Sequence, residues 1–217
     1  MDNTQRLGFL SSVGLVLVGA AYAVVVGFGI AQAGLDKPII DPTLAVMEAI
    51  TLVSALLVVI LMAAVYRLAS PERKVFGLLA LAFGAIMAGL TSGVHFVALT
   101  AGRQTDFTTL EWPSTLYAVE LLAWDVFLGL ALVFAAPVFA GSGRSARARW
   151  ALTATGVLCL LGGIGPIVGD MAIQRIGILG YGVALPITCI ILALVFRHGA
   201  ESVHPNKQIQ PTACGRG

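Results

Sequence analysis

Charged residues are scarce in this 217-residue chain: 13 Lys or Arg and 11 Asp or Glu make up 11 % of the sequence, against 58 % hydrophobic residues. A water-soluble protein of this length needs more polar residues to cover its surface. The composition therefore excludes a soluble globule and predicts a protein whose solvent is lipid. The net charge of +2 is also too small to indicate nucleic acid as a partner.

Cysteine and histidine are rare too, with three residues of each. Cys159 and Cys189 lie in apolar segments and Cys214 lies in the polar end of the chain, and no CxxC or Cys/His spacing connects them. The cysteines therefore say nothing about the redox compartment. We expect no cofactor and assign no metal ligand.

Long apolar segments are abundant. About twenty apolar residues cross the ~30 Å hydrocarbon core of a bilayer as a helix. Six segments reach that length: residues 7–30, 42–66, 75–99, 113–140, 150–168 and 176–196. Backbone groups cannot stay unpaired in lipid, and the alternating pattern of barrel strands is missing, so we predict an all-α bundle of six transmembrane helices in one domain, residues 1–200. The polar segment 201–217 is expected to be a disordered tail.

A shorter mature protein is an alternative. Ala31-Gln32-Ala33 has the form of a signal-peptidase site, and cleavage there would leave five helices. The apolar run before it, residues 7–30, is longer than the ~7–15 residues typical of a signal peptide. Its length favours six helices.

The basic residues alternate between the two sides of the predicted bundle. One side carries ten: Arg6, Arg67, Arg73, Lys74, Arg144, Arg147, Arg149, Arg197, Lys207 and Arg216. The other side carries three: Lys37, Arg103 and Arg175. Because cytoplasmic loops are enriched in Lys and Arg, we predict a protein of the inner membrane with both termini in the cytoplasm.

The end of the chain resembles a known group of proteins. Pro205-Asn206-Lys207, followed by Gln210-Pro211-Thr212, is similar to the carboxy-terminal ends of proteins encoded by bacterial integron gene cassettes. The resemblance covers about a dozen residues and implies a bacterial host and a mobile gene; an ordinary polar tail is the alternative. The helical body resembles uncharacterised small bacterial multi-pass membrane proteins, and it resembles no family with an assigned activity.

Four ionisable residues lie inside the predicted helices: Glu48, His95, Glu120 and Asp125. A charge at the centre of a membrane helix costs about 2.5–3.5 kcal/mol, so each needs an explanation. By the predicted topology all four fall between the outer surface and the middle of the membrane. They predict an outward-facing polar pocket bounded by the second, third and fourth helices.

Spacing indicates which side chains share a helix face. Tyr117, Glu120 and Trp124 follow an i, i+3, i+7 pattern and form one stripe, whereas Asp125 is about 140° away from Glu120 around the helix. Ser92 shares a stripe with His95. These residues complete the candidate pocket, although the two acids are expected to point in different directions.

Other features are predicted to surround this pocket. Arg103, Asp170 and Arg175 are placed in the outer connections as residues of its rim. A row of small residues, Ala85, Gly89 and Gly93, is expected to let a neighbouring helix approach closely. The glycines at 162, 163 and 165 are interpreted in the same way.

Three functions fit this pattern. The first is binding or transport of a small solute or ion, with Asp125 and Glu120 holding a cation or proton. The second is a membrane-embedded, metal-dependent hydrolase that uses His95 and the carboxylates; it is less favoured because His198 and His204 belong to the opposite side, so we favour a non-enzymatic role. The third is a protein that contacts a partner through its glycine-rich faces. The lipid bilayer is the expected environment, and the sequence leaves a homo-oligomer open.

Overall fold

The computed structural model describes residues 1–34, 37, 39–104 and 112–198. Every regular element in these residues is a helix. Six helical stretches are long and apolar enough to cross a membrane: Asn3–Ala33, Thr43–Leu68, Pro71–Arg103, Thr115–Val138, Gly143–Val168 and Met171–His198. The prediction of an all-α six-helix bundle is confirmed, whereas the predicted disordered tail lies outside the described residues.

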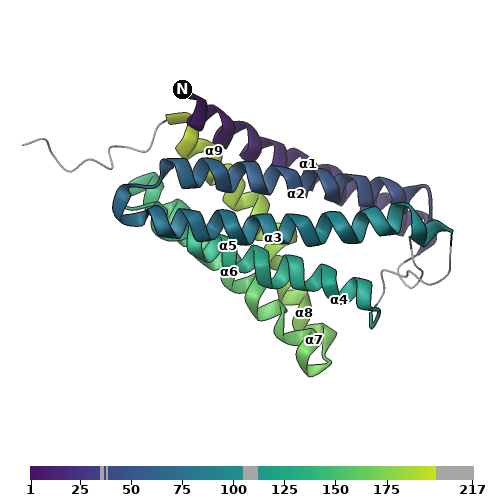
Figure 1. Cartoon of the computed structure of the whole chain (residues 1–217). Coiled ribbons are helices and arrows are strands. Elements are labelled where there is room, and N and C mark those ends of the chain that lie inside the picture. Colours follow the sequence, from purple (N-terminus) through teal and green to yellow (C-terminus); the bar gives the residue numbers. More distant parts are fainter. Residues whose placement is uncertain (35–36, 38, 105–111, 199–217) are drawn as a thin grey trace, which may run out of the picture.

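The first three long helices lie side by side along the bundle (Figure 1): α1 (Asn3–Ala33), α2 (Thr43–Leu68) and α3 (Lys74–Leu99). The last helix, α9 (Leu185–His198), packs against α1, and Gly8 near the start of α1 contacts the ring of Phe196 near the end of α9. The described chain therefore begins and ends at the same end of the bundle. We call it the basic end, because the turn from α2 to α3 and the start of α6 (Gly143–Gly162) bring their Lys and Arg residues there.

Two of the six spans, within the described residues, contain a π-helical turn. The fourth span consists of α4 (Thr115–Leu121), the π-helical turn η3 (Leu122–Phe127), α5 (Leu128–Ala135) and the 3₁₀ turn η4 (Ala136–Val138). The sixth consists of α8 (Met171–Ile178), the π-helical turn η5 (Leu179–Ala184) and α9. Pro137 lies in η4, and Pro186 lies in α9, two residues after η5 ends. Because proline has no backbone N–H, neither residue can donate the hydrogen bond of an α-helix. No pattern in the sequence predicted the π-turns.

Three helices begin earlier than the sequence predicts. α1 starts at Asn3 because Asp2 and Gln5 form a capping box, in which the Gln5 N–H donates to Asp2 Oδ1 at 2.8 Å. α6 starts at Gly143 and includes the Arg- and Ala-rich residues 144–149, which are good helix formers. α8 starts at Met171, because the Asp170 carboxylate accepts the Ala172 N–H at 2.8 Å. The predicted link between the fifth and sixth helices is therefore partly helical.

Glycines bring several helix backbones together. A Cβ at Gly156 of α6 would lie 2.7 Å from the carbonyl oxygen of Gly129 in α5, and Gly162 of α6 touches the backbone of Gly177 in α8. A Cβ at Gly165, in the short helix α7 (Ile164–Val168), would lie 2.5 Å from the backbone nitrogen of Gln174. The packing interpretation of Gly162 and Gly165 is thereby confirmed.

The predicted role of the other small-residue row is wrong. Ala85, Gly89 and Gly93 are exposed, and a Cβ on Gly89 or Gly93 would meet no atom within 4 Å. The face of α3 that packs in the bundle instead carries Gly84, Met87 and His95. Small size alone does not identify the inner face of a membrane helix.

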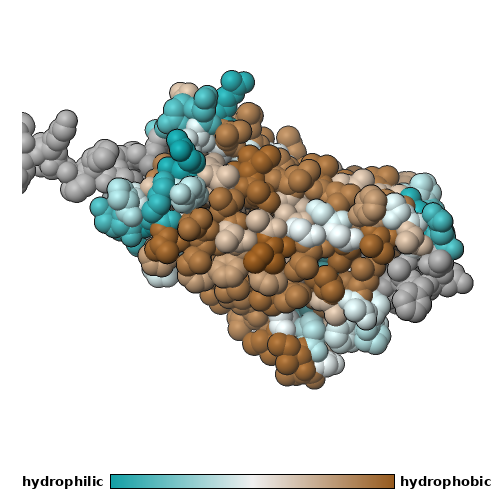
Figure 2. Space-filling model, viewed as in Figure 1, coloured by the Kyte–Doolittle hydropathy of each residue, from teal (hydrophilic) through white to brown (hydrophobic). Residues whose placement is uncertain are grey.

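The outside of the bundle is apolar. Figure 2 shows hydrophobic residues over the middle of one face and hydrophilic residues toward its two ends. Val24 and Ile167, for example, are 72 % and 83 % exposed. An apolar band between two polar ends is the surface that a bilayer requires.

The contact between α5 and α6 provides a test of the packing. We expect Gly156→Leu to destabilise the protein by about 1–3 kcal/mol or more, because the side chain would have to displace the α5 backbone. Gly93→Leu is the matched control, since it adds the same side chain where there is open space. Thermal unfolding in detergent measures both; equal loss in the two variants would contradict this packing.

Candidate functional site

Three of the predicted residues meet near the end opposite the basic end. His95 of α3 lies between Glu48 of α2 and Glu120 of α4: its Nδ1 contacts Glu48 Oε2, and its Nε2 lies 2.8 Å from Glu120 Oε1. Glu48 is 5 % and His95 6 % exposed. We call this cluster the triad. The sequence analysis placed these three side chains in one pocket, and the structure brings them into direct contact.

The triad has to hold shared protons. A neutral imidazole has one N–H and one acceptor nitrogen, whereas an ionised carboxylate only accepts hydrogen bonds. Two contacts from one ring to two carboxylates therefore need two protons in total, carried either by an imidazolium or by a neutral ring and one carboxylic acid. In both cases the triad has a net charge of −1.

One buried oxygen of the triad has no hydrogen-bond partner among the described residues. Glu120 Oε1 accepts from the Trp124 Nε1–H at 2.5 Å as well as facing His95. Glu120 Oε2 is buried and has no hydrogen-bond partner within the described part of the chain. A buried carboxylate oxygen without a partner is costly, so this atom is where a further proton or a cation would bind.

Two tyrosines lie within electrostatic range of the triad carboxylates. Tyr117, which the sequence analysis included, interacts electrostatically with Asp125 and Glu120. Tyr22 of α1 interacts electrostatically with Glu48 and Glu120. Sequence reasoning missed this tyrosine because it lies in an apolar run without a charge. Ser92 is half-buried on α3 and forms no hydrogen bond with the triad among the described side chains.

Asp125 belongs to a second site. It is fully buried in η3, and its Oδ2 accepts from the Gln174 Nε2–H at 3.3 Å. The Asp125 Oδ1 is buried without a partner in the described residues. It lies against Gly162 and Gly177, and a Cβ on Gly177 would collide with it. Only a glycine at position 177 leaves room for this carboxylate.

The expectation that one pocket holds all four ionisable residues is therefore wrong for Asp125. The expected difference in direction between Glu120 and Asp125 is what separates them, since Glu120 faces α3 whereas Asp125 faces α6 and α8. Gln174, its partner, was missed because residues 169–175 were interpreted as a link. Its burial, with 1 % exposed, was not detectable from sequence.

An aromatic pair lies between the two sites. The rings of Trp124 and Tyr181 have centroids 5.5 Å apart. Trp124 is hydrogen-bonded to Glu120, and the Tyr181 hydroxyl accepts from the Gln174 Nε2–H at 3.1 Å. Trp124 and Asp125 lie in η3 and Tyr181 lies in η5, so both π-helical turns contribute to this connection. Such turns occur frequently at functional sites.

The predicted rim residues have other partners or positions. The Arg103 guanidinium donates to Asp41 Oδ1 at 2.7 Å and thereby connects the segment before α2 to the turn η2 (Ala101–Arg103) after α3. Asp170 caps α8, and Arg175 is exposed on that helix. In the described structure neither forms an ion pair with the triad.

The residues needed for a metal centre are not assembled in the part of the chain that the structure describes. No group of three or more His, Cys, Asp or Glu side chains there is arranged to hold a metal ion. Both ring nitrogens of His95 face carboxylates, and His198 lies at the basic end, where its Nδ1 is 2.9 Å from the Leu194 carbonyl oxygen. His204 lies outside the described residues. The hydrolase alternative has no support in this geometry.

Comparison with known proteins provides no related protein from which a function could be inferred. No protein-family model, curated protein or solved structure matches this chain. Any functional assignment therefore depends on the chemistry of the triad and of Asp125.

The triad makes a prediction about stability. We expect His95→Leu to cost about 3–5 kcal/mol, because it leaves two buried carboxylates without their shared partner. A triple variant, Glu48→Met with His95→Leu and Glu120→Met, should be more stable than the single variant, since it removes the charges together. His198→Leu, at the basic end, is the control. Thermal unfolding in detergent that ranks the triple variant below His95→Leu would show that the three side chains are not coupled.

Proposed function

We propose that this protein is a proton-coupled membrane carrier of a small cation or cationic solute, and that the triad is the site where proton and cation exchange. The observation that supports the proposal is the buried Glu48–His95–Glu120 cluster, with Glu120 Oε2 unpaired among the described residues. Ionisable groups buried in membrane helices are costly and are typical of ion and proton pathways.

Charge balance explains why the exchange would be obligatory. The triad with two protons carries a charge of −1, which the surrounding lipid penalises. A third proton or one monovalent cation near Glu120 Oε2 brings the net charge to zero. Both together would leave a charge of +1 in the same low-dielectric surroundings, so proton and cation compete for one site. Competition of this kind is the basis of exchange transport.

Asp125 provides a second binding position deeper in the bundle. It has the same property as Glu120, a buried carboxylate oxygen that no described residue satisfies. In this conformation the Trp124–Tyr181 contact separates it from the triad, because a contact between two tilted rings provides no hydrogen bond for a proton to follow. Movement of this aromatic pair would join the two positions, and both residues lie in π-helical turns, which occur frequently at functional sites.

The predicted orientation is consistent with this function. The triad lies at the end of α3 and the start of α2, opposite the basic end. By the positive-inside rule the basic end faces the cytoplasm, so the triad would exchange with the exterior and Asp125 would lie further along the path inward.

Flux measurements test the triad. Purified protein in liposomes containing a pH-sensitive dye should release or take up protons when a cation gradient is applied, and Glu120→Gln and Glu48→Gln should each reduce that signal at least tenfold. Glu72→Gln is the matched control, because Glu72 is exposed outside the triad. Unchanged flux in both triad variants would exclude the triad as the exchange site.

Asp125 is tested by an isosteric change. Asp125→Asn keeps the size of the side chain and an acceptor for Gln174, and it removes the titratable group, so we expect correct folding with loss of proton-coupled flux. Asp170→Asn is the control, since asparagine also caps a helix. Proton-coupled flux at the normal rate in Asp125→Asn would contradict the role of the deeper site.

A further inference from the structure

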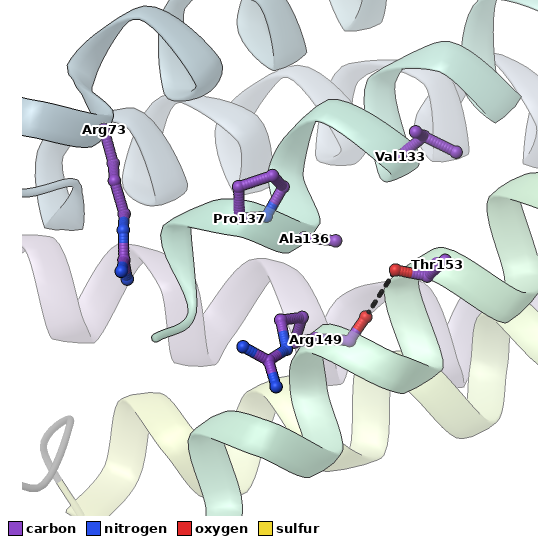
Figure 3. A pocket seen from close by; sticks show the side chains of 6 residues that line it. All are labelled: Arg73, Val133, Ala136, Pro137, Arg149 and Thr153. Atoms are coloured by element: carbon purple, nitrogen blue, oxygen red, sulfur yellow. Dashed lines mark hydrogen bonds between the residues drawn. The ribbon is translucent and has the colours of Figure 1, made fainter. Parts of the chain in front are cut away.

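A pocket opens at the basic end, away from the triad and Asp125. It has a volume of about 410 Å³ and is lined by Arg73, Val133, Ala136, Pro137, Arg149 and Thr153. The residues come from the 3₁₀ turn η1 (Pro71–Arg73) that precedes α3, from α5 and η4, and from α6 (Figure 3). A volume of this size is within the range of small-ligand sites.

The break in the fourth span borders this pocket. At Pro137 the chain has left α-helical geometry for the 3₁₀ turn η4. In the close-up view of Figure 3, Arg73 and Arg149 lie toward one side of the pocket and Val133 and Thr153 toward the other, with Ala136 between the two groups. The two guanidinium groups are the charged groups of this lining.

Both arginines are half-buried, and neither forms an ion pair with a carboxylate of the described residues. Glu72 precedes Arg73 and interacts with it electrostatically, but it is exposed. The neighbouring Lys74 is engaged elsewhere, since its ammonium donates to the Tyr66 carbonyl oxygen at 3.0 Å. Thr153 is engaged as well, because its hydroxyl donates to the Arg149 carbonyl oxygen at 2.9 Å.

We propose that this pocket binds the phosphate of an anionic phospholipid, held by Arg73 and Arg149. Guanidinium groups match phosphate oxygens in a two-point geometry, and basic pockets between transmembrane helices at this face are typical sites for anionic headgroups.

The surroundings favour a lipid over a free phosphate ion. Trp150 is 67 % exposed and lies against the Arg149 guanidinium, 5.9 Å from ring centroid to Cζ, as an aromatic residue at headgroup level does. Leu78 of α3, about one turn beyond Arg73, and Val157 of α6, about two turns beyond Arg149, are apolar and exposed. A ligand with its phosphate in the pocket and its acyl chains along the bundle would satisfy both the charge and the apolar surface.

Lipid titration tests the assignment. Native mass spectrometry of the full chain in detergent, with phosphatidylglycerol or phosphatidylcholine added, counts bound lipid and gives the dissociation constant. We expect preferential binding of phosphatidylglycerol, weakened at least tenfold by Arg73→Gln and by Arg149→Gln. Arg147→Gln is the matched control, because Arg147 is exposed on the same helix, carries the same charge and does not line the pocket.

Each other result would overturn the proposal. An equal loss in Arg147→Gln would indicate unspecific attraction to the whole basic end. Equal binding of phosphatidylcholine would indicate a purely apolar contact, and protection against thermal unfolding by inorganic phosphate alone, as large as that by phosphatidylglycerol, would assign the pocket to the free ion. Arg149→Lys, which keeps the charge, should retain part of the binding; its unfolding temperature without lipid shows whether the site is still folded.

Discussion

The cost of placing a charge in lipid is the constraint on which this structure depends. In the triad and at Asp125, each buried ionisable group has a hydrogen-bond partner on a different helix. His95 connects α2, α3 and α4 through Glu48 and Glu120, and Gln174 connects α8 to Asp125 in the fourth span. The polar contacts therefore fix which helices are neighbours, because apolar side chains alone pack almost equally well against lipid and against each other.

Glycine makes the deeper of these contacts geometrically feasible. The Asp125 carboxylate lies against Gly162 and Gly177, whose backbones touch across α6 and α8. A side chain at either position would displace the carboxylate or separate the helices. The two glycines and Asp125 thus form one structural unit, in which the absence of side chains on the glycines leaves room for the carboxylate between two closely packed backbones.

Sequence reasoning predicted the features that follow from the length of the apolar runs and from the energetic cost of a charge in lipid. Six lipid-length apolar runs predicted the bundle, and rarity of charge identified Glu48, His95, Glu120 and Asp125 as the residues to explain. What it could not predict depends on side-chain direction. The row of Ala85, Gly89 and Gly93 has the composition of a packing face, yet it faces outward. The inward face of α3 is the one that carries His95, which contacts Glu48 of α2 and Glu120 of α4. Gln174 and the two π-turns have no signature in composition, because an extra residue in a helical turn is a property of packing.

The unusual features are concentrated in the fourth span, and the reason is its position. In its most apolar stretch 56 % of the residues are buried, against 11–39 % in the other five spans, so it is the central helix of the bundle. A central helix touches several others, and only such a helix can carry Glu120 toward α3, Asp125 toward α6 and α8, and Pro137 toward the pocket at the basic end. A regular α-helix would hold these groups in one fixed angular relation. The π-turn η3 between Glu120 and Pro137, and the 3₁₀ turn at Pro137 itself, relax that relation at two points. A shift of this span would therefore change the triad, the surroundings of Asp125 and the arginine pocket together.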